Sequence, residues 1–125
     1  RGQAYDVRRI LELSLDQESL FEMGSEFGPS LVTCLARVDG RPVGVIANDC
    51  TRAGGAMTAD AARKLRRFLQ TLRTFSIPAV FFVDEPGFNV GLEAESQATI
   101  RYGTEAVLET STFSLPSCAV VLRKA

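Results

Sequence analysis

The feature that most restricts the fold is an apolar run at residues 79–83, Ala-Val-Phe-Phe-Val. A strand with one face in water alternates apolar and polar residues, whereas this run has no polar member. It therefore predicts a strand covered on both faces, which is typical of a sheet with helices on either side. The run ends at Asp84-Glu85-Pro86-Gly87, a sequence that favours a turn.

The segments around this strand predict an α/β domain. Residues 31–38 and 43–47 are rich in β-forming residues and flank Asp39-Gly40, a strong hairpin signal. A short amphipathic helix is expected at 5–13 and a second helical stretch at about 92–112, with Gly103 as a possible break. Residues 118–122 predict another buried strand.

A longer helix is expected between the hairpin and the apolar run, with Thr58 as its N-cap and Pro78 closing the segment. Its apolar residues share one face: Ala61, Leu65, Phe68, Leu69, Leu72 and Phe75. Its basic residues, Arg63, Lys64, Arg66 and Arg67, are expected on the solvated face, with a phosphate clamp as the alternative.

Composition excludes several classes of protein. A length of 125 residues predicts one domain, and a formal charge of -1 argues against a nucleic-acid partner. No apolar run approaches the ~20 residues that a membrane span needs. Cys34, Cys50 and Cys118 have no metal-binding spacing, so we expect buried thiols, no metal and a cytoplasmic protein.

The chain contains no histidine, which removes the commonest general base and the usual Ser-His and Cys-His nucleophiles. Main-chain groups could replace them at residues 86–91, Pro-Gly-Phe-Asn-Val-Gly, where a turn can direct N–H groups at developing negative charge. A plain strand-to-helix turn is the alternative. Asp84 and Glu85 are adjacent in a strand and should point to opposite faces, so we expect structural roles for both.

Several segments, in this order, resemble the carboxyl-terminal domain of the carboxyltransferase (beta-type) subunit of biotin-dependent acyl-CoA carboxylases. They are Tyr5-Asp6-Val7-Arg8, residues 40–48, residues 62–68, residues 77–91, Ile100-Arg101-Tyr102-Gly103, and Val120-Val121-Leu122-Arg123-Lys124-Ala125. Together they span nearly the whole chain. The resemblance implies a crotonase-like (ClpP/crotonase) spiral of ββα units.

The resemblance also implies a reaction that transfers CO2 from carboxybiotin to the α-carbon of an acyl-CoA of the acetyl, propionyl or methylcrotonyl type. Family members rely on main-chain amides, and the biotin nitrogen serves as the base. The main-chain carbonyl of Phe88 would approach that nitrogen, which makes Gly87 and Phe88 the catalytic candidates. Val90 and Gly91 would complete the biotin site. Residues 21–48 correspond to a segment assigned to acyl-CoA binding, and the other candidates for this role are Gly54, Gly55 and Arg123.

The resemblance further implies that residues 1–125 are part of a larger carboxyl-terminal domain. The amino end has neither a starting Met nor a signal core, which indicates a cut inside a longer chain. The family's oxyanion Gly-Ala pair would follow Ala125, so we expect this piece alone to be inactive. The implied partners are a biotin carboxyl carrier protein, which supplies carboxybiotin, biotin carboxylase, and further copies of the subunit.

Two alternatives remain open at this point. One is another crotonase-fold acyl-CoA enzyme, a hydratase or hydrolase, in which Glu93 or Glu95 would be the catalytic carboxylate. The other is a non-catalytic module that assembles a multienzyme complex.

Overall fold

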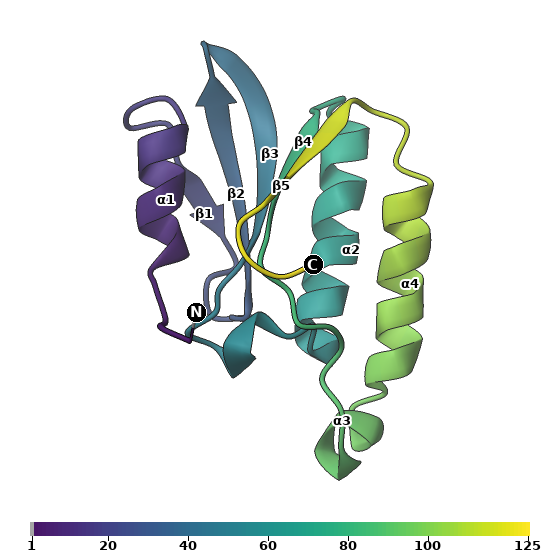
Figure 1. Ribbon diagram of the computed structural model, residues 1–125. Helices are drawn as coiled ribbons and strands as arrows, with labels where there is room; N and C mark the ends of the chain where they lie inside the picture. The colour runs from purple at the N-terminus through teal and green to yellow at the C-terminus, as the bar shows by residue number, and fades with distance from the viewer. Residues whose placement is uncertain (1) are drawn as a thin grey trace.

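A five-stranded sheet in the order β1-β2-β3-β4-β5 organises the computed structural model, which describes residues 2–125 (Figure 1). The strands are β1 (Phe21–Met23), β2 (Leu31–Val38), β3 (Arg41–Asn48), β4 (Ala79–Val83) and β5 (Ser117–Val121). β1, β2 and β3 pair antiparallel, whereas β3–β4 and β4–β5 pair parallel. The sequence did not predict β1.

The predicted hairpin is confirmed. β2 and β3 pair from Val38↔Arg41 to Leu31↔Asn48, and Asp39 and Gly40 both have positive φ, 51° and 75°. Positive φ at both central residues is what a two-residue type I′ turn requires. The carboxylate of Asp16 accepts hydrogen bonds from the backbone N–H of Asp39 (2.9 Å) and of Gly40 (2.7 Å), which fixes the turn.

Helices cover both faces of the sheet (Figure 1). α1 (Val7–Ser14) lies on one face, and α2 (Ala59–Thr74) and α4 (Thr99–Ser111) lie on the other. The short elements are η1 (Ala53–Gly55) before α2 and α3 (Leu92–Ser96) before α4. β2, β3 and α2 follow one another as a ββα unit. No helix in residues 2–125 is both long and apolar enough to cross a membrane.

The apolar strand β4 contributes to both cores, as predicted. Ala79 and Phe81 pack in the cluster beneath α2, which includes Leu69. Phe82 packs in the cluster beneath α1, which includes Leu11. The alternation along β4 therefore places successive side chains in two different cores.

Helix α2 begins as predicted, because the hydroxyl of Thr58 accepts a hydrogen bond from the Ala61 N–H (3.1 Å). Two predictions about its faces were wrong. Phe75 is 68% exposed because the helix ends at Thr74 and the chain turns there. Lys64 is only 6% exposed, since its stem is buried and its ammonium donates to the Leu31 carbonyl oxygen (2.6 Å).

The predicted break at Gly103 was also wrong. The helical stretch is interrupted at Gln97-Ala98, where Ala98 has a φ of 57°, and Gly103 lies inside α4. A Cβ at Gly103 would stand 2.4 Å from Cε1 of Phe88, so the aromatic ring occupies the space that a side chain would need.

The last strand was predicted to be buried, and this prediction was wrong. All residues of β5 are exposed, including Cys118, whereas Cys34 and Cys50 are buried. β5 is an edge strand that pairs only with β4, and in residues 2–125 no further layer covers it.

Candidate functional site

The turn after β4 runs beside the segment that precedes α2. The N–H of Met57 donates to the Gly87 carbonyl oxygen (2.9 Å), and the N–H of Asn89 donates to the Met57 carbonyl oxygen (2.9 Å). These two bonds form a parallel bridge between Met57 and Phe88. In such a bridge the N–H and C=O of the middle residue point away from the partner. Within residues 2–125, neither main-chain group of Phe88 has a hydrogen-bond partner.

Gly87 has a φ of 125°, a backbone conformation that favours glycine, and there is open space where a Cβ would lie. The ring of Phe88 is 46% exposed and packs against Gly103 of α4. Val90 and Gly91 are exposed in the segment that leads to α3. The turn therefore presents bare main chain at the surface, with the Phe88 ring anchoring it to α4.

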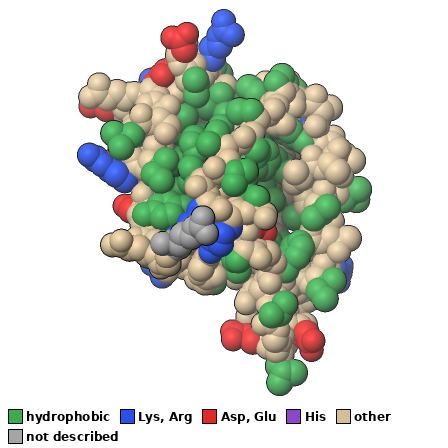
Figure 2. Space-filling view, viewed as in Figure 1, with side chains coloured by type: hydrophobic (Ala, Val, Ile, Leu, Met, Phe, Trp, Pro, Cys, Tyr) green, Lys and Arg blue, Asp and Glu red, His purple; other side chains and the backbone are tan. Residues whose placement is uncertain are grey.

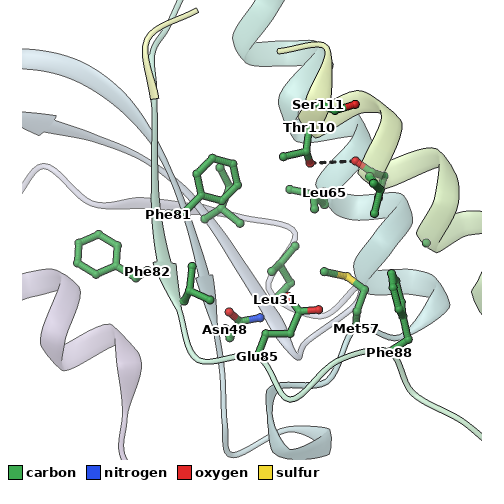
Figure 3. A pocket seen from close by; sticks show the side chains of 15 residues that line it. Leu31, Asn48, Met57, Leu65, Phe81, Phe82, Glu85, Phe88, Thr110 and Ser111 are labelled. Carbon is green, nitrogen blue, oxygen red and sulfur yellow. Dashed lines mark hydrogen bonds between the residues drawn. The ribbon is translucent and has the colours of Figure 1, made fainter. Parts of the chain in front are cut away.

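A cavity of about 360 Å³ lies between the sheet, α2 and α4, with Phe88 on its wall (Figure 3). This volume is at the lower end of the range for small-molecule sites. Figure 2 shows apolar side chains gathered in the hollow beside α4. Its apolar lining includes Leu31, Ile46, Met57, Leu65, Phe81 and Ala106. The cavity suits a ligand with an apolar ring.

Glu85 is a carboxyl group on the wall of this apolar cavity, next to Asn48 (Figure 3). Burial raises the pKa of Glu85, and the side-chain amide of Asn48 acts in the opposite direction. Residues 2–125 place no cation within ion-pair distance of it. Glu85 and Asn48 thus give the apolar cavity a polar edge at the end of the sheet, although the sequence predicted only a structural role for Glu85.

Asp84 points away from the cavity, as the alternation of the strand predicts. Its side chain is fully buried. Oδ2 accepts a hydrogen bond from the Tyr5 hydroxyl (2.6 Å) and forms an ion pair with Nη2 of Arg123 (2.9 Å), and Oδ1 accepts a hydrogen bond from Nε of Arg123 (3.3 Å). Burial alone would raise the pKa of Asp84, but these two partners outweigh it and lower the pKa below its ordinary value. Burial, and after it the contact with Asp84, raise the pKa of Tyr5, whose hydroxyl is held as a donor.

The three acyl-CoA candidates lie around a second hollow, of about 560 Å³, between the chain ends and η1. Gly54 and Arg123 line it, together with Cys50 and Lys124. Gly55 is buried beside it, and a Cβ there would stand 2.7 Å from the Asp84 carbonyl oxygen. Gly55 therefore has a packing role at this point, which a Gly-Gly pair in a loop does not reveal.

The candidate catalytic carboxylates of the hydratase or hydrolase alternative lie away from this cavity. Glu93 and Glu95 are exposed on α3, which projects from one end of the molecule (Figure 1). Neither lines the cavity beside Phe88. The sequence did not predict that Tyr5 and Asn48 contact Asp84 and Glu85, and the available signals were the segments Tyr5-Asp6-Val7-Arg8 and residues 40–48, which carry part of the resemblance.

Comparison with known proteins agrees with this architecture. The family model described as "Carboxyl transferase domain" matches residues 1–125. The biotin-dependent acetyl-/propionyl-coenzyme A carboxylase beta5 subunit of Mycobacterium tuberculosis is 36% identical over 124 residues, 99% of this chain and 22% of its own length. The methylmalonyl-CoA decarboxylase subunit alpha of Veillonella parvula is 34% identical over 97% of this chain and 24% of its own length.

Among solved structures, transcarboxylase 12S with methylmalonyl-coenzyme A and methylmalonic acid bound superimposes with a TM-score of 0.94. Its sequence is 36% identical, and the match covers 98% of this chain and 24% of that one. The chain thus spans about a quarter of the length of these relatives. With the family model matched throughout and the fold shared, the chain belongs to the carboxyl transferase domain family and has its crotonase-like α/β fold.

Proposed function

We propose that this chain is the biotin-binding part of the carboxyl-terminal domain of a carboxyltransferase, which transfers a carboxyl group between carboxybiotin and the α-carbon of an acyl-CoA. One observation carries the proposal. The main-chain groups of Phe88 have no partner in residues 2–125 and are turned away from the Met57 bridge, beside an apolar cavity of small-molecule size.

Carboxybiotin supplies the carboxyl group and, once that group has left, the nitrogen that takes a proton from the acyl-CoA α-carbon. The Phe88 carbonyl oxygen would accept a hydrogen bond from this nitrogen, and Gly87 would let the main chain approach the ring closely. The apolar wall of the cavity would hold the sulfur-containing ring. Val90 and Gly91 would flank the entrance. None of these roles needs histidine.

The acyl-CoA is proposed to bind in the hollow lined by Gly54 and Arg123, and the packing of Gly55 sets the shape of this hollow. Acetyl-, propionyl- and methylcrotonyl-CoA are the substrate class. The guanidinium of Arg123 already pairs with Asp84 and donates to the Gln3 carbonyl oxygen (3.1 Å), so only part of it faces this hollow. Its contact with CoA stays a prediction.

The direction of transfer has two candidates, because one relative is named a methylmalonyl-CoA decarboxylase subunit. In that direction the same site would take the carboxyl group from the acyl-CoA. A biotin carboxyl carrier protein, a biotin carboxylase and other copies of the subunit are the proposed partners. The hydratase or hydrolase alternative lacks support from the exposed positions of Glu93 and Glu95.

The proposal is tested in a chimera in which this chain replaces the matching segment of the M. tuberculosis beta5 subunit. We expect the chimera to decarboxylate malonyl-CoA or methylmalonyl-CoA only when free biotin is added. In parallel, 15N NMR of the 125-residue chain should show biotin-induced shifts of the Gly87 and Phe88 amides. An assembled chimera without transfer, together with a chain whose amides ignore biotin, would exclude this function.

A further inference from the structure

Five separate stretches of the chain meet at Asp84, at the end of β4. Tyr5 and Arg123 bind its carboxylate, and the ring of Tyr5 lies 5.2 Å from the Arg123 guanidinium carbon. The N–H of Asp84 donates to Oδ1 of Asn48 (3.0 Å) at the end of β3. Its carbonyl oxygen packs against Gly55 of η1. Both chain ends, two strand ends and one loop are thus held at a single buried group.

Main-chain bonds extend this junction toward the proposed biotin turn. The N–H of Glu85 donates to the Lys124 carbonyl oxygen (3.1 Å), and the N–H of Leu122 donates to the Val83 carbonyl oxygen (2.8 Å). These bonds place residues 122–124 alongside the last residues before Gly87. Arg123 therefore lies between two main-chain bonds that fix the entry to the turn.

A gain in stability does not by itself explain the ion pair between Asp84 and Arg123. A buried ion pair often contributes no more stability than apolar residues of the same size, because both charges must leave water. What such a pair supplies is one defined geometry. A site built from main-chain groups depends on that geometry, because a carbonyl oxygen cannot be re-aimed by a change of rotamer, and an error of about 1 Å can cost ~100-fold in rate.

We propose that Asp84 and Arg123, with Tyr5 as the third member, are positioning residues that hold the Gly87-Phe88 turn and the main chain after β5 in register. This inference rests on the function proposed above and assigns the three side chains no contact with the reacting atoms. Arg8 provides a matched control, since it pairs with the buried Asp49 (2.9 Å) after the neighbouring strand β3 and does not contact the turn.

The test compares Arg123→Met, Arg123→Lys and Arg8→Met in the chimera. We expect Arg123→Met to lower kcat for biotin-dependent transfer by about 100-fold, whereas the loss of a CoA contact alone would raise KM for the acyl-CoA and leave kcat unchanged. Arg123→Lys keeps the charge and should recover most of kcat. Arg8→Met should lower the melting temperature at least as much, with kcat nearly unchanged.

A readout without activity separates this inference from the proposed function. In the 125-residue chain, Arg123→Met should shift the Gly87 and Phe88 amide resonances and speed their hydrogen exchange, whereas Arg8→Met should not. If the two variants act equally on these amides, or if Arg123→Met keeps kcat within threefold of the parent, the pair is structural only. If the parent chimera is active and the variants give either of these results, the positioning role is excluded but the proposed function is not.

Discussion

Two buried aspartates follow adjacent strands of the sheet, and they are satisfied in different ways. Asp49, after β3, accepts hydrogen bonds from the N–H and hydroxyl of Thr51, two residues ahead, and from Arg8, which it shares with Glu22. Within residues 2–125, Asp84, after β4, has no such local partner for its carboxylate, and its side-chain partners Tyr5 and Arg123 come from the two ends of the chain.

The difference separates two uses of a buried carboxylate. Asp49 closes a turn that its own neighbours largely define, so changes elsewhere in the chain should leave it in place. Asp84 depends on residues remote in sequence, and the turn that follows it carries the proposed biotin site. The Asp84 end of the sheet should therefore tolerate change poorly in function, and the Asp49 end should reveal change mainly in stability.

The largest expected effect is at Gly87. Gly87→Val should abolish transfer in the chimera, with a loss of at least ~100-fold, because methyl groups would occupy the space proposed for biotin. Backbone strain of about 1 to 3 kcal/mol should leave the fold intact. Gly40→Val is the control, since Gly40 also has positive φ and open space at its Cβ position. Turnover and thermal melting are measured for both; turnover of Gly87→Val within a few-fold of the parent would make Gly87 only a turn residue.

The next effect concerns the free energy of unfolding. Asp84→Asn should lower it by about 2 kcal/mol, because the fully buried carboxylate loses its charge and leaves the partly exposed Arg123 guanidinium unbalanced. Asp49→Asn should cost about 1 kcal/mol, since the Thr51 hydrogen bonds can persist. Urea denaturation of both variants measures the difference. Equal losses would remove the contrast between the two ends.

Acid should act on both ends in the same direction. The pKa values of Asp49 and Asp84 are both lowered in the fold, so their contribution to stability is present above the ordinary carboxyl pKa of about 4. It is lost as the pH falls through the folded pKa of each group. Unfolding free energy measured between pH 5 and about pH 2 should fall less steeply in Asp84→Asn than in the parent; an unchanged slope would contradict the assigned pairing.

The smallest effect is expected at Glu85, where the pKa is shifted in the opposite direction and stability therefore changes with pH in the opposite sense. Burial raises its pKa, so its contribution to stability is present below the ordinary pKa and is lost as the pH rises through the folded value. Glu85→Gln should therefore be slightly more stable than the parent at pH 7, by less than about 1 kcal/mol, with little difference at pH 4. Thermal melting at the two pH values measures this; a lower stability at pH 7 would indicate that the charged carboxylate has a favourable partner.

Local signals predicted the fold well where the structure depends on neighbours in sequence. Asp39-Gly40 gave the hairpin because turn geometry is local, and the apolar run of β4 gave a strand shared by two cores. Lys64 was misplaced because periodicity counts charges and does not register that a long stem can bury while its ammonium reaches the Leu31 carbonyl oxygen. Strand β5 was misplaced because composition does not tell an edge strand from a central one.

The candidate site was predictable in part. The turn at Gly87 and Phe88 was predicted from glycine spacing and from the resemblance, and the positive φ of Gly87 agrees with a residue chosen for its lack of Cβ. The junction at Asp84 was not predictable, because its contact with Tyr5 joins opposite ends of the chain. Glu85 gave no signal, since whether a carboxyl faces water or a cavity depends on how α4 packs.

The packing of the Phe88 ring on Gly103 links the turn after β4 to helix α4. In any divergent or redesigned version of this chain, positions 88 and 103 should vary as a single unit. A methyl group at position 103 would displace the ring and carry the turn with it, whereas Gly103→Ala combined with Phe88→Leu frees the volume that the methyl group needs. The sequence of α4 thus sets which side chains the turn can accept, although no residue of that helix belongs to the turn.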